Sequence, residues 1–385
     1  MRIARRYIAS EIYRSSAVVL LALLGLFSFF SLIEELDQLS ATLSLANLLY
    51  LQLLNIPTQL YELLPIGLLI GAVLALAGLA QRNELVILRA SGVSGFQLLI
   101  SLWIITIPLM IGAFVLSEYI TPRAEIQSSE SSLKLLGKAG GGRLNSGYWF
   151  KETDTPDRTR LINITHLRGK SSVADIHVYE FTAEQHLHSY IQAEHGEFQP
   201  DHLLLKNVQR SVIDTHALDA LQAGVTPTAP IIALEHQNEL KLQTSLSAER
   251  LLVRVLTPER MAITDLLDYI DYLEINQLQT DRQTVALWRK LAYPFTLLVM
   301  ITIAAPISFM QTRHGGVGSK IFVGILLGVG FFMANQLALN LGMLTNLQPW
   351  LTALFPSIFA LTVALIALLF IENSHRWSQR FRREN

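Results

Sequence analysis

Six long apolar runs, arranged as two groups of three, dominate the chain. They cover residues 17–33, 63–80, 96–117, 291–310, 321–344 and 351–371, and none of them contains Lys, Arg or Asp. Each run is close to the ~20 residues that an α-helix needs to cross about 30 Å of hydrocarbon. The pattern predicts an α-helical polytopic membrane protein with six transmembrane helices in a 3+3 arrangement.

Lysine and arginine are sorted between the two ends of these helices. They occupy the N-terminal segment, the 81–95 and 311–320 loops and the C-terminal tail, whereas residues 34–56 and 342–350 contain none. Because basic residues stay on the side from which helices insert, both termini and the two loops are expected in the cytoplasm. Acidic residues follow the first run where a signal peptide would have a cleavage site, so a retained helix is predicted.

The region between the two helix triplets is polar, and its periodicity changes. Residues 118–136 predict a polar continuation of the third helix, and short alternating runs follow at 176–181, 187–191, 203–208 and 212–213. Turn-forming residues at 154–157, 199–201 and 226–230 punctuate the region. Such alternation is typical of half-buried strands and predicts an inserted β-sandwich or β-jelly-roll-like domain. Thr257 and Pro258 predict the start of an amphipathic helix through Leu273.

Composition excludes several classes of protein. With 51% hydrophobic and 16% charged residues among 385, the chain is not a single soluble globule. The absence of cysteine excludes thiol catalysis, thiolate metal sites and disulfides. Zinc-protease and phosphate-loop motifs are missing, and solvated positions beside a turn explain His186 and His188 better than a metal site does. The sequence therefore predicts no catalytic residue, no metal site and no cofactor bound by this chain.

Polar and small residues inside the apolar runs narrow the mechanism. No run contains an acid, and Glu62, directly before the second run, can reach interfacial water, so proton-coupled transport lacks a relay. The fifth run carries a polar stripe that is expected to face a helix or a wet cavity; helix packing is favoured over substrate lining. The stripe comprises Phe332, Asn335, Gln336 and Asn340. Close helix contacts are predicted at Gly67, Gly71 and Ala75, and at Gly324 and Gly328.

The loop after the second run carries the most specific local signal. Residues 79–96 read LAQRNELVILRASGVSGF, which predicts a short helix that ends at Ser91 and Gly92 and displays one carboxylate, Glu84. Its apolar body lies where water is expected, so it is interpreted as a docking knob for a soluble partner or as a helix resting on the bilayer. The candidate docking residues are Glu84, Leu85, Leu88 and Arg89.

This loop, the LDQL sequence at 36–39 and residues 331–337 resemble the LptF/LptG family of lipopolysaccharide export permeases, and the LptG branch more than its LptF sibling. The resemblance covers the whole chain. It implies an ABC-transporter transmembrane subunit that pairs with an LptF-type sibling above an LptB-type ATPase dimer, which uses ATP and Mg. LptC and LptA would receive the lipopolysaccharide. The loop helix, at about 82–92, would be the coupling helix, with Glu84 contacting the ATPase. Phe331 joins the stripe as a substrate-path candidate.

One departure concerns the family's lysines near the outer ends of the first two spans, which meet lipid phosphates. The matching positions here are Glu34, Ser40, Ala41 and Thr58. Arg123, Arg289 and Lys290 are candidate lipid-phosphate contacts instead, although ordinary interfacial anchoring is the favoured interpretation.

The predicted organisation has three parts in a Gram-negative inner membrane. Residues 1–117 hold spans one to three, residues 118–290 form a periplasmic β domain with flanking helical segments, and residues 291–385 hold spans four to six and a basic tail. An LptF-type subunit or a non-transporting periplasmic scaffold is the alternative function.

Overall fold

The structure, a computed structural model, describes residues 2–36, 44–136, 147–155, 158–167, 171–199, 202–214, 224, 230–244, 246, 256–309, 317–345 and 347–381. The chain divides into two compact units. The helical unit comprises Met1–Leu36, Asn55–Thr121 and Asp281–Asn385. The β unit comprises Asp37–Leu54 and Pro122–Thr280. The β unit thus begins four residues and ends ten residues inside the predicted 118–290 domain, and it also takes in residues 37–54.

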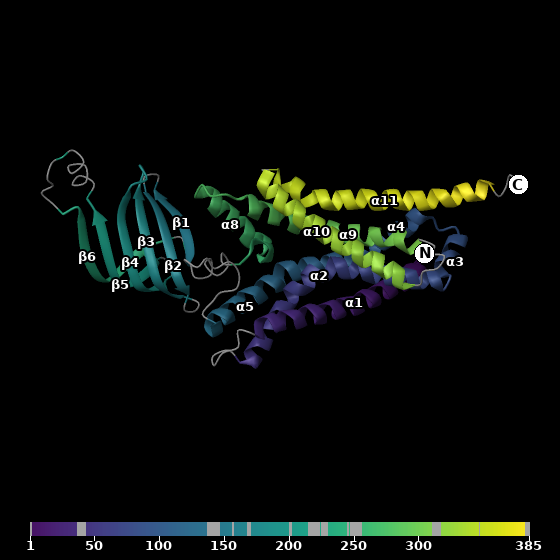
Figure 1. The fold of residues 1–385 in the computed structure, drawn as a ribbon, viewed down its shortest axis with the longest axis horizontal. Helices are drawn as coiled ribbons and strands as arrows, with labels where there is room; N and C mark the ends of the chain where they lie inside the picture. The colour runs from purple at the N-terminus through teal and green to yellow at the C-terminus, as the bar shows by residue number, and fades with distance from the viewer. Residues whose placement is uncertain are drawn as a thin grey trace. The chain divides into compact units, whose positions relative to one another are not determined.

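Six helices are long and apolar enough to cross a membrane in the described part of the chain, as predicted (Figure 1). The first three are α1 (Arg2–Leu36), α2 (Leu45–Gln81) and α4 (Gly95–Val115). The last three are α9 (Asp281–Phe309), α10 (Val317–Thr345) and α11 (Pro349–Phe381). A short helix, α3 (Glu84–Ala90), lies between α2 and α4. Beyond α4 the chain continues as a π-helix, η1 (Leu116–Ile120), and then as α5 (Thr121–Leu136).

The centre of the helical unit is built from α2, α4 and α9. Leu69, Leu99 and Leu297, one from each helix, are fully buried in one apolar cluster. Small residues bring neighbours close, because a Cβ added at Gly71 of α2 would collide with the backbone of Ser16 in α1. A Cβ added at Gly324 of α10 would touch the side chain of Val73 of α2. The predicted small-residue faces are therefore confirmed as helix contacts.

The β unit contains a six-stranded antiparallel sheet in which each strand pairs with the next along the chain (Figure 1). The strands are β1 (Tyr148–Thr155), β2 (Arg158–Leu167), β3 (Ser172–Thr182), β4 (Leu187–Phe198), β5 (His202–Ile213) and β6 (Ile232–Gln243). The inserted β domain is confirmed, with its described strands in one curled sheet. β1, β2 and β6 were not predicted individually, and the two runs at 203–208 and 212–213 form one strand.

Two residues with positive φ bend the sheet. Asp175 in β3 has a φ of 53° and Asn207 in β5 has a φ of 55°, a conformation that Asp and Asn tolerate better than most residues. Side-chain alternation shifts at each, so that Leu205 and Val208 both point inward, three positions apart. The curl encloses an apolar interior whose fully buried residues include Ile162, Val178 and Leu203.

One edge of the sheet is covered by α8 (Ile263–Ile275). Tyr272 donates its hydroxyl to the Lys151 carbonyl at 2.6 Å, and the Thr153 amide donates to the Asn276 side-chain oxygen at 2.9 Å. These bonds satisfy backbone groups of β1 that an open edge would expose. The predicted amphipathic helix is confirmed, although it starts at Ile263 after a 3-10 turn, Pro258–Arg260, and Thr257 makes no side-chain cap.

Candidate functional site

The loop between α2 and α4 has a closely defined geometry. Asn83 adopts a φ of 60° just before α3, and Gly92 a φ of 88° just after it. The Val93 amide donates to the Leu88 carbonyl at 3.3 Å, which closes the C-terminus of α3 around the glycine. Ser94 then caps α4 by accepting the Gln97 amide at 3.2 Å. The helix predicted at about 82–92 is therefore present as Glu84–Ala90, and its C-terminus is closed around Gly92.

The apolar side chains of α3 divide between the two sides of the helix. Leu85 is 4% exposed and packs in the helical core, whereas Ile87 is 62% exposed. Leu88 is half-buried against the same core. The side chain of Arg89 lies outside the described residues. Among the predicted docking residues, Leu85 therefore holds α3 on the helical unit. Ile87, which was not among them, is a large apolar side chain that α3 exposes.

A pocket of about 210 Å³ lies between α3 and the first turns of α1. Its lining residues are Ala4, Tyr7, Ile8, Leu79, Glu84, Ile87 and Leu88. The Tyr7 hydroxyl lies within hydrogen-bonding reach of the Glu84 carboxylate and also interacts with Arg82. Arg82 in turn is 3.9 Å from Glu11. The contribution of α1 was not predicted, because α1 is remote from this loop in the sequence.

The stripe on α10 lies largely on the outside of this chain. Phe332 is 56% exposed, and Gln336 and Asn340 are exposed as well. Phe331 instead packs partly on the helical core, and Asn335 donates to its carbonyl at 3.4 Å. Packing within the chain therefore does not explain the two exposed polar residues. A neighbouring subunit or a wet cavity would have to cover them in a membrane.

The three candidate lipid-phosphate residues differ in accessibility. Arg123, on α5, is exposed, and Arg289, on α9, is half-buried. Lys290 is only 9% exposed, and its ammonium group donates to the Ser117 carbonyl at 3.3 Å. Of the positions that match the family's lysines, Thr58 is buried, Glu34 is exposed, and Ser40 and Ala41 lie outside the described residues. Lys290 thus serves a bond inside the helical unit.

Two tyrosines join α2 to α9 beside this lysine. The rings of Tyr61 and Tyr293 stack with their centroids 4.1 Å apart, and the Tyr293 hydroxyl donates to the Tyr61 carbonyl at 2.5 Å. Tyr61 also interacts with the Ser117 hydroxyl and with Arg289. Ser117 belongs to the π-helix, and it meets α9 through its carbonyl and α2 through its hydroxyl.

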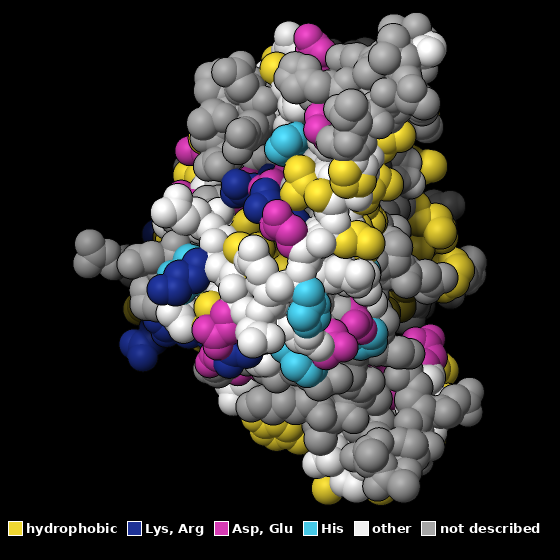
Figure 2. Space-filling view, turned by 90° about the vertical axis from the view of Figure 1, so that its left-hand side faces the viewer, with side chains coloured by type: hydrophobic (Ala, Val, Ile, Leu, Met, Phe, Trp, Pro, Cys, Tyr) yellow, Lys and Arg dark blue, Asp and Glu magenta, His cyan; other side chains and the backbone are white. Residues whose placement is uncertain are grey.

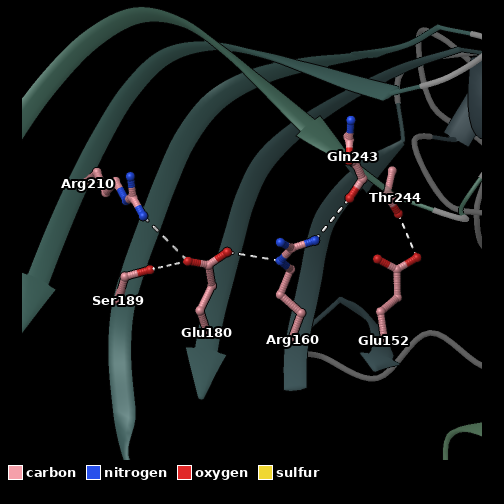
Figure 3. Close-up of polar contacts among 7 residues, drawn as sticks. All are labelled: Glu152, Arg160, Glu180, Ser189, Arg210, Gln243 and Thr244. Carbon is pink, nitrogen blue, oxygen red and sulfur yellow. Dashed lines mark hydrogen bonds and ion pairs between the residues drawn. The ribbon is translucent and has the colours of Figure 1, made fainter. Parts of the chain in front are cut away.

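A row of polar side chains crosses the inner face of the sheet (Figure 3). Glu152, Arg160, Glu180 and Ser189 stand opposite one another on β1 to β4. Glu180 accepts from Arg160 at 2.9 Å and from Ser189 at 2.6 Å, and Arg210 lies 3.6 Å away. Burial alone would raise the pKa of Glu180. The Ser189 hydrogen bond and the two arginine charges outweigh it and lower the pKa.

The last residue of β6 and the chain just beyond it close over this row. Arg160 donates to the Gln243 carbonyl at 3.0 Å, and Thr244 donates to Glu152 at 2.7 Å (Figure 3). Leu246 then enters the apolar interior. We call these two bonds the seam. The seam holds the end of β6 against β1 and β2, although β6 and β1 are at opposite ends of the strand order.

The face of the molecule drawn in Figure 2 is mixed in character. Figure 2 looks at the side where β6 lies in Figure 1, and it shows basic, acidic and histidine side chains interspersed with hydrophobic ones. Among the described residues no group of His, Asp or Glu could hold a metal ion. Exposed hydrophobic residues of β6 include Ile232 and Leu234.

Sequence comparisons cover nearly the whole chain. The family model described as lipopolysaccharide export system permease LptF/LptG matches residues 6–370. The lipopolysaccharide export system permease protein LptG of Escherichia coli strain K12 is 25% identical over 368 residues, which are 94% of this chain and 97% of that protein. The LptG protein of Haemophilus influenzae strain Rd is 25% identical over 356 residues, which are 92% of this chain and 94% of that protein.

Proposed function

The chain belongs to the LptF/LptG family of lipopolysaccharide export permeases, and we propose that it is the LptG-type transmembrane subunit of an ATP-driven exporter. As a permease subunit it moves lipid rather than transforming it. The LptG assignment is supported by the two relatives, each of which aligns over more than nine tenths of the chain. ATP and Mg would be used by a partner chain.

The proposed orientation places α3 and both termini in the cytoplasm and the β unit in the periplasm. Its support is the distribution of charge, since the basic residues cluster beside α3 and at the two termini. The membrane would be the inner membrane of a Gram-negative bacterium. This orientation puts α3 on the side where ATP is available.

The observation that carries the proposal is the anchored helix α3. It is fixed to the helical core by Leu85, while Ile87 and the end of the helix that carries Glu84 remain at the surface. A rigid link of this kind transmits a push from a nucleotide-driven ATPase dimer to α2 and α4, which flank it. We propose that α3 is the coupling helix and that Glu84 is its charged contact.

The physical problem for such an exporter is the cost of moving acyl chains through water. Each exposed methylene costs ~0.8 kcal/mol, so a multiply acylated lipid would cost tens of kcal/mol. A continuous apolar path avoids this cost. We propose that a cavity between this chain and an LptF-type sibling, lined partly by the α10 stripe, leads to the β unit.

The apolar interior of the β unit would then receive the acyl chains. In the described structure this interior is filled by its own side chains and crossed by the seam. Acyl chains would enter when the seam parts. LptC and LptA would accept the lipid beyond this point.

The experiment is affinity capture of the full-length chain, co-expressed with the sibling subunit and the ATPase. Glu84→Arg is expected to abolish ATPase retention and export, because it reverses the charge of the proposed contact. Membrane insertion and sibling pairing should be unchanged. Normal ATPase retention and export in the Glu84→Arg protein would refute the docking role of α3.

A further inference from the structure

The sheet of the β unit carries two neighbouring rows of side chains on the face that lies opposite its apolar interior. Each row takes one residue from each strand, paired in register. The first row is Trp149, Asn163, His177, Gln192, Gln209 and His236, and the second is Lys151, Leu161, Tyr179, Tyr190, Ser211 and Leu234. Because the residues between them on the strands, such as Ile162 and Val178, are buried in the interior, both rows lie on the outer face. We call them the outer rows.

An aromatic strip runs along the outer rows from β1 to β4. The ring centroids of Trp149 and Tyr179 are 5.9 Å apart, and those of Tyr179 and Tyr190 are 5.1 Å apart. The Tyr190 hydroxyl lies 2.8 Å from His177 Nδ1. Since Trp149 on β1 reaches Tyr179 on β3, the indole lies across β2, where Asn163 is only 4% exposed. Trp149 itself is 46% exposed, so the strip presents aromatic surface to solvent.

The polar groups beside the strip are uncharged. Gln192 and Gln209 are exposed next to His177, and the only formal charge on the outer rows, with histidine neutral, is that of Lys151. An amide both donates and accepts hydrogen bonds, as a sugar hydroxyl does, whereas a carboxylate only accepts and an ammonium group only donates. The C–H groups of a sugar ring carry a small positive charge and meet the negative face of an aromatic ring. The outer rows therefore have the chemistry that a neutral saccharide requires.

The substrate of the family contains such a ligand. The family exports lipopolysaccharide, whose sugars are hydrated and whose acyl chains need an apolar environment. The inner face of the sheet is apolar, and Trp149 lies on β1 three residues from Glu152, which the seam holds. A lipid that enters where the seam parts would straddle β1, with its acyl chains on the inner face and its sugars on the outer face.

A protein partner fits this surface less well. Protein interfaces place their exposed apolar side chains together in a desolvated centre. The two most exposed apolar side chains of the outer rows, Trp149 and Leu234, instead stand at opposite ends of the strand order, on β1 and β6. Neutral polar residues lie between them, which favours a hydrated ligand.

We propose that the outer rows bind the saccharide part of the exported lipopolysaccharide, with Trp149 as the stacking surface and Gln192 and Gln209 as hydrogen-bonding groups. The inference rests on the proposed function, and it names the part of the substrate that contacts the outside of the β unit. A few contacts of this kind sum to a dissociation constant of about 1 mM. Weak binding suits a position from which the lipid must move on.

Saturation-transfer NMR tests the binding directly. The probe is the saccharide released from lipopolysaccharide by mild acid, and the protein is the full-length chain in phosphatidylcholine nanodiscs. Trp149→Ala should weaken binding about fivefold or more, and so should Gln192→Leu combined with Gln209→Leu, which leaves every ring in place. Trp350→Ala, which removes a tryptophan of similar exposure, 41%, from α11, should have no effect. Dextran, an unrelated neutral polysaccharide, should not compete.

Three results would overturn the inference. The first is unchanged binding in the glutamine double variant, which tests the site even if Trp149→Ala disturbs the sheet. The second is an equal loss in the Trp350→Ala protein, which would show that detergent-like contacts with any exposed tryptophan explain the signal. The third is equal binding of dextran, which would show a general glycan surface without preference for the exported lipid.

Photo-cross-linking from Gln192 in cells that contain the whole exporter gives an independent readout. We expect a lipopolysaccharide adduct, whereas a protein adduct would show that a partner subunit covers the outer rows. No adduct at Gln192, with normal export by the glutamine double variant, would refute the inference and leave the proposed function standing. Export that continues in cells depleted of this chain would refute the proposed function and the inference together.

Discussion

The ammonium group of Lys290 on α9 donates a hydrogen bond to the carbonyl of Ser117, in the π-helix that ends the third span. A lysine at this position in the sequence would ordinarily be assigned to the membrane surface. Burial of the side chain and the Tyr61–Tyr293 stack beside it place it in a junction of three helices instead. The π-helix supplies the backbone carbonyl that receives it.

We expect Lys290→Met to destabilise the helical unit by roughly 1 to 3 kcal/mol, because the Ser117 carbonyl loses its donor. The melting temperature of the purified protein should fall, and lipid cross-linking should remain. Arg282→Met, at an exposed position of the same helix, is the control. Unchanged melting together with a loss of lipopolysaccharide binding would show that Lys290 is a phosphate contact.

The same substitution at two glycines of α2 is expected to change stability in opposite directions. Gly→Ala in a helix gains about 1 kcal/mol of propensity, and Gly78 has open space around it. Gly78→Ala should therefore be neutral or stabilising. At Gly71 the new methyl group would meet the Ser16 backbone, so Gly71→Ala should cost about 1 to 3 kcal/mol. Thermal unfolding of the two proteins in one detergent checks the difference, and equal shifts would contradict the close contact of α1 with α2.

The polar row of the β unit should make the stability of that unit depend on pH. The pKa of Glu180 is lowered in the folded protein, so its pairing stabilises the fold fully above the unfolded pKa, about 4.3. That contribution is lost as pH falls through the folded value. Glu180→Gln should weaken protection of β3 and β4 at pH 7, by roughly 1 to 3 kcal/mol. The difference from the native protein should shrink below about pH 4.

Hydrogen exchange of the two full-length proteins, compared at each pH, measures this difference directly. Glu197→Gln is the matched control, because Glu197 and its partner Lys206 are both about half exposed and lie 3.5 Å apart. Exposed pairs contribute little to stability. A gap between native and Glu180→Gln proteins that stays constant from pH 7 to about pH 3 would show that the charge of Glu180 is not responsible.

The sequence predicts those features that depend on local composition. Span positions follow from apolar runs, and the helix at 82–92 follows from its capping residues, Ser91 and Gly92. It could not show that Leu85 faces the core while Ile87 faces outward, because that division depends on where α1 packs. Nor could it locate the buried position of Lys290, which depends on a π-helix more than 170 residues earlier.

Strands were predicted only where hydrophobic alternation is strong. β3 and β4 alternate clearly, whereas β6 reads IALEHQNELKLQ and exposes most of both faces. Such a strand is stabilised by its neighbour β5 rather than by its own pattern. The curl of the sheet depends on positive φ at Asp175 and Asn207, which no periodicity indicates. The seam joins residues remote in sequence and follows from that curl.

The exposed stripe on α10 predicts which surface of this chain is covered in the working transporter. Gln336→Leu with Asn340→Leu would stabilise the isolated chain if these residues faced lipid. If they face the sibling subunit or a wet cavity, the same change removes hydrogen bonds worth roughly 1 kcal/mol each, and export should fall several-fold. Met333→Leu, at a position that is 61% exposed on the same helix, should have no effect.

Photo-cross-linking from Gln336 in cells then distinguishes a substrate cavity from a subunit contact. A lipopolysaccharide adduct indicates substrate lining, and a sibling adduct indicates subunit packing. Unchanged export in the double variant, with neither adduct, would place the stripe against lipid and move the proposed path to other helices.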